Sequence, residues 1–450
     1  MSDALRALFR RAHGQLPPAP QHGVESFYAL GHELDVVCDG TACHFAGGPG
    51  IDPQLPRVRC VGHCYEAPSR LTGPSVATGN GHPALLKNLA STPVVLRHLL
   101  TDSRGEADHD DLPSGDDILA VIEGVGLRGR GGAAYPTAAK WKVAKAQPSA
   151  EKWVVANGDE GDPGSWIDRL LLERSPHAVL AGMRACGRAI GANRGVVYIR
   201  GEYPRARAAV EAALAEERFD DMRIHVVGGH GSYVVGEETA LLNAIEGQRG
   251  EPRPKPPYPA VSGLFGKPTV VQNVETLSII PHIVRANSGA SHKAICVAGA
   301  VREPACVEVT LGTPLRRVLN EACGGPREGS RWTMALVGGP LGRVIPAAAF
   351  DVELAYDALP GLGHGGVVVF DASVSPGALF RHLAEFARSE SCGSCTPCRV
   401  GSARIADMRD TPSLDRLLTT MEMGSLCGFG QGVPRPIRDL VELCGERVLG

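Results

Sequence analysis

Residues 389–400 carry three cysteines, each separated from the next by two residues, and a fourth, Cys427, follows in a glycine-rich loop. Three thiolates on one short loop can bind three corners of a [4Fe–4S] cube, and the distant cysteine can bind the fourth. Structural zinc sites usually take two separated pairs of ligands, which differs from three cysteines on one loop. A zinc ion remains the alternative to the cluster. The sequence therefore predicts a [4Fe–4S] cluster with the ligands Cys392, Cys395, Cys398 and Cys427.

A second group of four cysteines lies near the start of the chain and forms two pairs, Cys38 with Cys43 and Cys60 with Cys64. Such pairs suit a [2Fe–2S] cluster, in which each pair binds one iron, and we predict this cluster here. A zinc ion bound by the same four thiolates is the alternative. The other five cysteines show no ligand spacing, so we expect them to be small buried side chains. They are Cys186, Cys296, Cys306, Cys323 and Cys444.

The length of the chain, 450 residues, exceeds what one hydrophobic core can hold and predicts three or four domains. Lysine and arginine number 46 against 49 aspartates and glutamates, so a formal charge of −3 does not favour nucleic acid as a partner. Thirteen cysteines, an odd number of which eight have metal-binding spacings, together with no recognisable signal peptide, predict a cytoplasmic protein. No apolar run approaches the ~20 residues that span a bilayer, so we expect no direct membrane insertion.

Hydrophobic periodicity divides the rest of the chain into regions of different type. Residues 152–280 alternate strand-like and helical segments, which is typical of a wound α/β domain. Residues 293–370 contain several short β-rich runs around one helix, whereas 376–450 are helical apart from the cysteine loops. Residues 69–82 are rich in Gly, Ser, Thr and Pro and predict a linker. The acidic run 106–111 is expected to be solvated.

Glycines and basic residues concentrate in residues 129–141. Consecutive glycines allow main-chain N–H groups to converge on an anion, and Arg130 and Lys140 add positive charge, so the segment suits a phosphate. A plain flexible loop is the alternative. Gly124 and the glycines that follow it match the dinucleotide fingerprint by letter. A helical pattern precedes them where that motif needs a strand, so we do not favour an ordinary Rossmann site.

Two further polar segments follow predicted strands, which is where open α/β sheets bind ligands. Residues 157–164 hold three carboxylates and an amide, and residues 228–239 lead into a helix. The proline-rich stretch 249–259 is expected to form an extended rim that carries Lys255 and Tyr258 outward. An anion-binding loop, carboxylates for ribose hydroxyls and aromatic side chains together predict a nucleotide site.

These segments also carry a family resemblance, through the motifs at residues 126–137, 157–168, 236–241 and 266–276 and the cysteine loop 389–400. Together they resemble the NADH-binding flavoprotein subunit of respiratory complex I. The same motifs resemble the diaphorase subunits of NAD-dependent molybdenum or tungsten formate dehydrogenases and of NAD-reducing hydrogenases. The resemblance spans about residues 120–430.

The resemblance implies a set of cofactor-binding residues. Those expected to hold FMN are Gly129, Arg130, Gly131, Gly132, Lys140, Asn157, Asp159, Gly236, Glu237, Asn273 and Thr276. Those expected to contact NAD(H) are Tyr135, Glu160, Asp162, Tyr233, Glu238, Lys255 and Tyr258. Within the second set, Glu160 and Asp162 are the predicted catalytic pair and would orient the nicotinamide.

The resemblance also implies a multidomain α/β architecture. It comprises a shortened thioredoxin-like [2Fe–2S] segment (1–80), an FMN/NAD(H)-binding α/β domain (81–285), a ubiquitin-like β-grasp domain (286–372) and a helical [4Fe–4S] domain (373–450). The chain departs from the family pattern at several positions. Ala134 stands where glycine is usual, Gln272 where asparagine is common, and only sixteen residues separate Cys43 from Cys60.

The predicted cofactors imply that the two electrons of a hydride are passed on one at a time. NADH gives two electrons as a hydride, whereas iron–sulfur clusters accept one at a time, and a flavin can separate the pair. We therefore predict a diaphorase subunit that exchanges hydride between NAD(H) and FMN and passes single electrons to or from a partner subunit.

Because a [2Fe–2S] segment is joined to the flavoprotein, we favour the beta subunit of an NAD-dependent formate dehydrogenase, whose partner would be the molybdenum or tungsten alpha subunit. The alternatives are the NADH-oxidising subunit of complex I and a subunit of an NAD-reducing hydrogenase. An alternative of another class is a non-enzymatic iron–sulfur electron-transfer subunit. The paired charges of Lys140, Glu237 and Glu238 oppose it, because an unused anion site does not need them.

Overall fold

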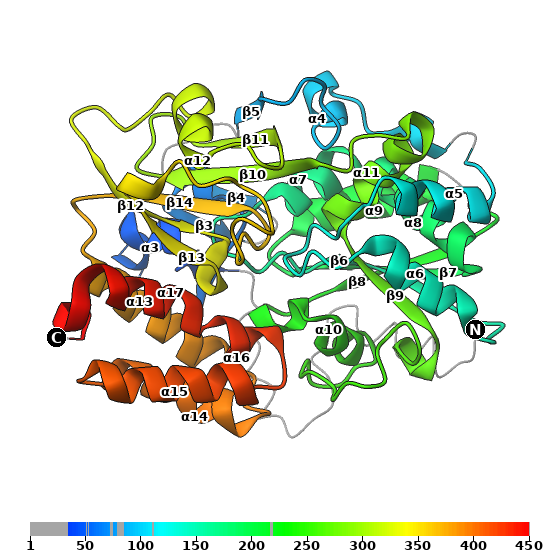
Figure 1. Ribbon diagram of the computed structural model, residues 1–450. Coiled ribbons are helices and arrows are strands. Elements are labelled where there is room, and N and C mark those ends of the chain that lie inside the picture. The colour runs from blue at the N-terminus through cyan, green and yellow to red at the C-terminus, as the bar shows by residue number, and fades with distance from the viewer. Residues whose placement is uncertain are drawn as a thin grey trace. The chain divides into compact units, whose positions relative to one another are not determined.

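The computed structural model describes residues 35–449, except for 51, 53, 73–74, 79–84, 110–111 and 217–218. The described chain divides into two compact units, coloured by residue number in Figure 1. Unit 1 contains Ala90–Glu160 and Ile167–Ala294. Unit 2 contains Asp35–Leu89, Gly161–Trp166 and Ile295–Gly450.

Unit 1 is built on a four-stranded parallel sheet with the strand order β8-β7-β6-β9. Its strands are β6 (Trp153–Gly158), β7 (Arg194–Ile199), β8 (Arg223–Gly228) and β9 (Thr269–Asn273). Consecutive β6 residues are buried on both faces, as expected for a parallel sheet covered by helices. The chain runs from β6 to β7 and β8 on one side, and β9 returns to the other side. The point between β6 and β9 is therefore a topological switch point, where such sheets bind ligands.

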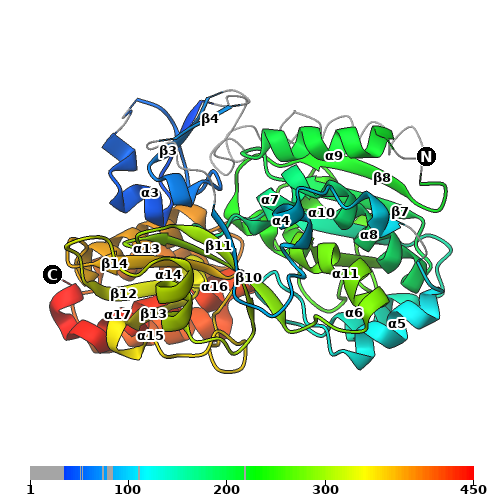
Figure 2. The same cartoon turned by 90° about the horizontal axis from the view of Figure 1, so that it is seen from above.

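Helices cover both faces of this sheet (Figure 2). On one face lie α8 (Pro176–Ile190) and α11 (Val274–Ala286), which pack on each other and on β6. They approach closely because Gly182 has no side chain; a Cβ there would lie 2.0 Å from the Leu277 carbonyl oxygen. On the other face, α10 (Glu238–Ile245) buries its leucines against the sheet. The remaining helices of unit 1 are α4 (Arg97–Thr101), η3 (Glu106–His109), α5 (Gly115–Gly124), α6 (Thr137–Ala146), α7 (Ile167–Arg174), α9 (Pro204–Glu216), η4 (Tyr233–Gly236) and η5 (Leu264–Gly266).

Unit 2 contains a six-stranded mixed sheet with the order β13-β12-β14-β10-β11-β5. The strands are β5 (Leu85–Asn88), β10 (His292–Gly299), β11 (Ala305–Thr310), β12 (Trp332–Val337), β13 (Arg343–Pro346) and β14 (Gly366–Asp371). The last five of these strands, in chain order, have the spatial order 2-1-5-3-4. They pack on α12 (Leu315–Arg317) and the π-helical turn η6 (Val318–Ala322). This arrangement supports the predicted β-grasp domain.

The sixth strand departs from the predicted domain limits. β5 lies in the range 81–285 expected for the FMN/NAD(H) domain, yet it pairs in parallel with β11 at the edge of the mixed sheet. Leu85 and Leu89 pack on the core of that sheet, which explains the placement. The chain passes from unit 2 to unit 1 after Leu89 and back after Ala294, and the short segment Gly161–Trp166 also belongs to unit 2.

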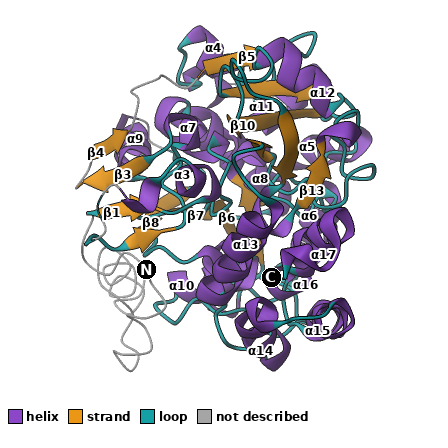
Figure 3. Cartoon of the chain, turned by 90° about the vertical axis from the view of Figure 1, so that its left-hand side faces the viewer, coloured by secondary structure: helices purple, strands orange, loops and turns teal. Residues whose placement is uncertain are grey.

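A smaller four-stranded sheet of unit 2 has the order β2-β1-β3-β4, and Figure 3 shows β1, β3 and β4 of this sheet. Its elements are β1 (Val36–Cys38), α3 (Thr41–Phe45), η1 (Gly48–Gly50), β2 (Arg57–Val58), η2 (Cys64–Glu66), β3 (Ser69–Thr72) and β4 (Ser75–Thr78). β1 and β2 are parallel, and β3 and β4 form an antiparallel hairpin. The prediction of a linker over residues 69–82 is therefore wrong for β3 and β4. This segment is rich in small residues, but it forms strands because β3 buries the side chains of Ser69 and Leu71. Residues 1–34 of the predicted thioredoxin-like segment lie outside the described residues.

The end of unit 2 is helical, as predicted for 376–450. Its elements are α13 (Pro376–Glu390), α14 (Thr396–Arg404), η9 (Ile405–Asp407), α15 (Thr411–Gly424), α16 (Gly428–Gly432), α17 (Pro434–Cys444) and η10 (Gly445–Val448). Helices α14 and α15 lie side by side in Figure 1. On α15, Leu414, Leu418 and Met421 are buried at the spacing of one helix face. Two short 3-10 turns, η7 (Gly339–Leu341) and η8 (Ala347–Ala349), complete the described helices of the unit.

Within the residues that the structure describes, no helix is both long enough and apolar enough to cross a membrane. Four of the five cysteines without ligand spacing are buried, as predicted, and Cys444 is partly exposed.

The expectation that the acidic run 106–111 is solvated is wrong for Asp108, which is 3% exposed. Its carboxylate accepts hydrogen bonds from Arg97, from His98 at 2.9 Å and from Arg285 at 2.8 Å. Burial by itself would raise the pKa of Asp108, but the His98 hydrogen bond and the two arginines outweigh it and hold the pKa well below its usual range.

Candidate functional site

The predicted ligand-binding residues gather at the switch point of the parallel sheet in unit 1. Asn157 and Asn273 are register partners at the carboxyl ends of β6 and β9. The Asn157 side-chain amide donates to the Gly236 carbonyl oxygen at 2.8 Å, and its side-chain oxygen accepts from the Asp159 N–H at 3.1 Å. A Cβ at Gly236 would lie 3.1 Å from the Asp159 carbonyl oxygen, so glycine permits this close approach. The ends of β6 and β9 and the turn before α10 thus lie together at the switch point, the place where open α/β sheets bind ligands in a crevice.

The glycine loop packs on the first turn of α11, whose N-cap residue is Asn273. The Arg130 N–H donates to the Thr276 hydroxyl at 2.8 Å. A Cβ at Gly131 would lie 2.9 Å from the Cβ of Asn273, so the loop can lie this close only with glycine there. Four predicted residues from two separate parts of the sequence, Arg130, Gly131, Asn273 and Thr276, therefore lie together at the switch point.

The side chain of Arg130 does not have the role that its charge suggests. It is fully buried, and its guanidinium donates to the carbonyl oxygens of Arg128 at 2.8 Å, His292 at 3.0 Å and Ala290. The interpretation that this guanidinium adds positive charge for an anion is therefore corrected: the side chain holds the loop through main-chain contacts.

The glycine loop also contains backbone that L-residues rarely adopt. Gly132 has φ +109°, and Ala134 has φ +49° where the family pattern has glycine. A left-handed conformation costs a residue with a Cβ roughly 1–2 kcal/mol. Ala134 is buried, so the surrounding structure must hold it in this conformation.

Two lysines and two glutamates form a charged cluster at the same end of the sheet. The Lys140 ammonium lies 3.1 Å from the Glu238 carboxylate and donates to the Val271 carbonyl oxygen at 3.1 Å. The Lys255 ammonium lies 2.7 Å from Glu237 and 3.9 Å from Glu238. The side chains come from α6, α10 and the proline-rich loop. All four are predicted site residues, and the lysines compensate two adjacent carboxylates.

Glu237 also begins α10. One of its carboxylate oxygens accepts from the N–H groups of Thr239 and Ala240, each at 2.9 Å. This is the N-cap arrangement of a helix, and the other oxygen contacts Lys255. The predicted residue Tyr233 lies in the preceding turn, η4.

The predicted catalytic pair is divided between the two units. Glu160 is 4% exposed, and its carboxylate accepts from the N–H groups of Asp168 at 3.1 Å and Arg169 at 3.0 Å, which begin α7. Asp162 belongs to the segment that packs in unit 2, where a Cβ at Gly339 would lie 3.0 Å from its carboxylate. Glu160 thus has a structural contact that sequence patterns did not indicate, and its catalytic role stays a prediction.

Two predicted aromatic residues and one unpredicted residue complete the site. Tyr135 and Tyr258 are 53% and 59% exposed. The predicted rim 249–259 thus carries Tyr258 outward, whereas the Lys255 side chain is 22% exposed and turns toward Glu237. Gln272 lies at the end of β9 and is buried, and its side-chain oxygen has no hydrogen-bond partner within the described residues. The Gln272 amide nitrogen would lie 3.8 Å from a Cβ at Gly129. A ligand with N–H or O–H groups, as FMN has, would satisfy this oxygen, so the residues present fit that cofactor.

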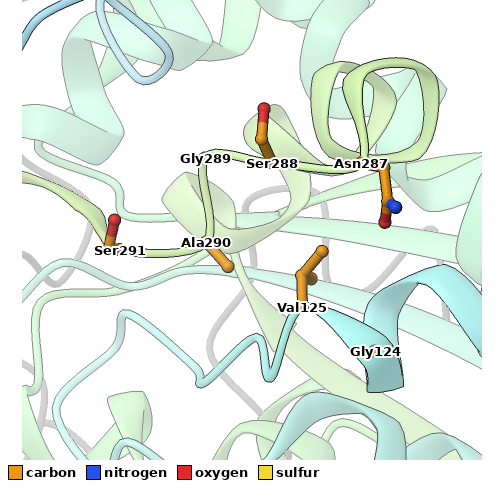
Figure 4. Close-up of a pocket in the computed structure, with 7 residues that line it drawn as sticks. All are labelled: Gly124, Val125, Asn287, Ser288, Gly289, Ala290 and Ser291. Atoms are coloured by element: carbon orange, nitrogen blue, oxygen red, sulfur yellow. The ribbon is translucent and has the colours of Figure 1, made fainter.

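The described chain also has a cavity of about 440 Å³ between the end of α5 and the loop after α11 (Figure 4). It is lined by Gly124, Val125, Asn287, Ser288, Gly289, Ala290 and Ser291. None of these residues is charged or among the predicted site residues, but the carbonyl oxygen of Ala290 accepts from the predicted site residue Arg130.

The C-terminal cysteines converge as predicted. Cys395 and Cys427 precede the first turns of α14 and α16, and Cys398 lies in the first turn of α14. Burial is the main cause that raises the pKa of the Cys398 thiol to about 12, and Cys395, Cys427 and Cys392 beside it also raise it. Four thiols this close lose their protons together only if a cation compensates the thiolates.

Other groups around these cysteines fit an iron–sulfur cluster. The Leu426 N–H points to the Cys395 sulfur at 3.5 Å. The hydroxyls of Ser402 and Ser425 are buried and have no hydrogen-bond partner within the described residues. A Cβ at Gly430 would lie 2.4 Å from the Ser425 hydroxyl, so glycine keeps this hydroxyl beside the cysteines. Cluster sulfides accept hydrogen bonds from such donors.

The N-terminal cysteines are also brought together, within unit 2. Cys38 ends β1 and Cys60 follows β2, and because these strands are parallel, both cysteines lie at the same edge of the sheet. The sulfurs of Cys60 and Cys64 are 3.6 Å apart. Contacts with Cys43 and Cys60, together with burial, raise the pKa of Cys38 well above its usual range. A tetrahedral metal with sulfur at about 2.3 Å places two of its sulfurs about 3.8 Å apart, so these positions fit a metal centre.

Comparison with protein families assigns three segments of the chain. Residues 122–282 match the Nuo51 FMN-binding domain. Residues 378–449 match the NADH-ubiquinone oxidoreductase-F iron–sulfur binding region, and residues 294–344 match the SLBB domain.

Individual relatives and solved structures agree with these matches. The chain is 36% identical to the F 2 subunit of the NADH-quinone oxidoreductase of Rhizobium meliloti (strain 1021) over 360 residues, 72% of this chain and 86% of the relative. It is 38% identical to the NADP-reducing hydrogenase subunit HndC of Solidesulfovibrio fructosivorans over 358 residues, 71% of this chain and 73% of the relative. A chain of the NAD⁺-reducing [NiFe]-hydrogenase in the H₂-reduced state superposes with a TM-score of 0.82 at 31% identity, covering 97% of this chain and 89% of that one.

The fold, the crevice and the C-terminal cysteines define an iron–sulfur flavoprotein that binds a nicotinamide nucleotide. The chain belongs to the family of NADH-binding FMN and [4Fe–4S] flavoprotein subunits of complex I and related NAD-reducing hydrogenases. It is an NADH-dependent flavin oxidoreductase, and its relatives are subunits of larger complexes.

Proposed function

We propose that this protein is a diaphorase subunit in which the crevice at the switch point of unit 1 binds FMN and NAD(H). The C-terminal cysteines would hold a [4Fe–4S] cluster that supplies one-electron transfer to or from a partner subunit. When bound, the flavin supplies the chemistry that separates a hydride into single electrons. The observation that carries the proposal is the convergence of the glycine loop, Asn157, Lys140 and the first turn of α11 on one crevice.

The residues of the crevice have distinct proposed roles. The main-chain N–H groups of the glycine loop and the Lys140 ammonium bind the phosphate of FMN, where their positive potential compensates a dianion. The Gln272 oxygen accepts a hydrogen bond from the cofactor. Glu160 and Asp162 orient the nicotinamide, and the exposed rings of Tyr135 and Tyr258 stack with NAD(H).

The proposal predicts that the purified chain, with FMN and iron restored, oxidises NADH with an artificial one-electron acceptor. The measurement is NADH absorbance with ferricyanide, before and after FMN is removed. FMN released from the protein fluoresces, so its content per chain can be determined independently. Full activity without FMN, or NADH oxidation that is absent from a preparation with one FMN per chain, would contradict the proposal.

We further propose that the N-terminal segment is a shortened thioredoxin-like domain with a [2Fe–2S] cluster bound by Cys38, Cys43, Cys60 and Cys64. The strand order β2-β1-β3-β4, with a parallel pair followed by an antiparallel hairpin, supports the fold. The Gly62 N–H donates to the Cys60 sulfur at 3.3 Å, and the Thr41 hydroxyl is buried without a hydrogen-bond partner in the described part of the chain. Donors of this kind stabilise cluster sulfurs.

The N-terminal cluster predicts a specific metal content for the full chain. A chain with both clusters holds six iron and six sulfide, and the double variant Cys60→Ser/Cys64→Ser should hold four of each, because only the cube remains. Iron, sulfide and zinc analysis, with electron paramagnetic resonance of the reduced protein, measures this. The Cys186→Ser variant is the control, since this cysteine is buried outside both sites. One zinc per chain that disappears in the double variant would establish the zinc alternative.

For the partner, we propose the molybdenum or tungsten alpha subunit of a formate dehydrogenase, because a [2Fe–2S] segment is joined to the flavoprotein. A hydrogenase partner is the second candidate. It is favoured by two relatives, the NADP-reducing hydrogenase subunit HndC and the NAD⁺-reducing [NiFe]-hydrogenase chain, whose superposition covers 97% of this chain. Purification of the complex from cells, followed by metal analysis for molybdenum, tungsten or nickel, distinguishes the two.

A further inference from the structure

Asp168 is a buried carboxylate that connects the two strands at the switch point of unit 1. It lies in the first turn of α7 and is 1% exposed. Its oxygens accept from the side-chain amide of Asn273 at 2.6 Å and from the N–H of Glu275 at 3.0 Å. Its own N–H donates to the Glu160 carboxylate. One residue thus contacts both the segment after β6 and the turn after β9.

The contact with Asn273 determines how this amide is oriented. The Asn273 nitrogen donates to Asp168, so its oxygen faces the Thr276 N–H, at 3.1 Å, and caps α11. Thr276 in turn accepts from the Arg130 N–H of the glycine loop. A side chain at position 168 that donates instead of accepting would favour the opposite orientation of Asn273. The cap of α11 would then be lost, and the glycine loop would lose its support.

We propose that Asp168 is a positioning residue for FMN: its carboxylate fixes the Asn273 amide and thereby the spacing between the glycine loop, α11 and the end of β6. This inference rests on the proposed FMN site. Asp168 does not itself need to touch the cofactor, because its carboxylate oxygens accept hydrogen bonds from the Asn273 amide and the Glu275 N–H. Its effect reaches the crevice through Asn273 and Glu160.

The test exchanges the carboxylate of position 168 and the amide of position 273. Asp168→Asn places an amide nitrogen against the Asn273 amide or the Glu275 N–H, so we expect FMN to bind about 10-fold to 100-fold more weakly, as for loss of a hydrogen bond to a charged group. In the double variant Asp168→Asn/Asn273→Asp, the amide nitrogen at position 168 can donate to the new carboxylate at position 273. That carboxylate can still cap α11, so we expect the double variant to bind FMN more tightly than Asp168→Asn. Because position 273 is itself an expected FMN contact, we expect it to bind FMN more weakly than the original protein.

The measurement is a fluorescence titration of the FMN-depleted full chain, with the flavin midpoint potential, thermal unfolding and iron content recorded in parallel. Asp102→Asn is the matched control, because it makes the same chemical change at a side chain that is 92% exposed in the same unit. Equal FMN binding by Asp168→Asn and the original protein would overturn the proposal. So would a double variant that binds FMN no better than Asp168→Asn while unfolding at the original temperature. If the original FMN-depleted chain itself fails to take up FMN, the proposed function fails instead.

Discussion

Replacing Lys140 with alanine is expected to release FMN from the protein. The Lys140 ammonium lies 3.1 Å from Glu238, so its removal leaves two adjacent carboxylates with Lys255 as the nearest compensating lysine of the charged cluster. The crevice would lose a cation for the FMN phosphate and gain net negative charge. Loss of one charge-assisted hydrogen bond costs about 1.5–3 kcal/mol, which is roughly 10-fold to 100-fold in affinity.

The matched control is Lys142→Ala on the same helix, because the Lys142 side chain is 48% exposed and pairs with Glu123 outside the crevice. FMN content after gel filtration and the dissociation constant from fluorescence titration measure the difference. Similar FMN retention in Lys140→Ala and Lys142→Ala would show that Lys140 does not contact the phosphate.

The Glu160→Gln variant tests whether FMN and NAD(H) bind to different residues of the crevice. We expect this variant to keep FMN and to react more slowly with NADH. It should also be destabilised by about 1–2 kcal/mol, because an amide replaces a carboxylate that accepts two N–H groups at the start of α7. Stopped-flow reduction by NADH and thermal unfolding measure the two effects. If Glu160→Gln loses FMN to the same extent as Lys140→Ala, the assignment of separate FMN and NAD(H) regions is wrong.

Replacing Cys395 with serine is expected to stop electron delivery to the partner subunit while NADH still bleaches the flavin absorbance rapidly. Cys395 precedes α14, and its sulfur accepts from the Leu426 N–H, so the site is built for a thiolate. Loss of a group that only supports a metal ligand costs about 10–100-fold in metal affinity, and loss of a ligand should cost at least as much. The signals of the [4Fe–4S] cluster should therefore decrease or disappear.

The control for this variant is Cys444→Ser. Cys444 and Cys395 are both partly exposed, but Cys444 lies at the end of α17 and has no ligand spacing. Electron paramagnetic resonance, iron content and partner reduction in the assembled complex are measured for both variants. Undiminished delivery from a Cys395→Ser protein that lacks the [4Fe–4S] signal would mean that electrons leave by another route.

Residue spacing and residue chemistry by themselves predicted one group of metal-binding thiols, the wound sheet and the ligand-binding edge of that sheet. The three cysteines of residues 389–400 predicted where thiols gather, because ligands on one short loop are close in any fold. The two N-terminal pairs are each close in sequence, but the parallel strands β1 and β2 bring one pair to the other. Alternating strand and helix patterns predicted the wound sheet, and polar residues after strands predicted its ligand-binding edge.

Only the tertiary structure decided what several charged side chains contact. The charge of Arg130 suggests an anion ligand, but its partner His292 is 162 positions away, and Asp168 meets Asn273 across 105 positions. Asp108 is buried because Arg97, His98 and Arg285 surround it. β5 joins a distant sheet because its leucines pack on that core. Buried polar groups require hydrogen-bond partners, and these partners come from segments that local sequence patterns do not connect.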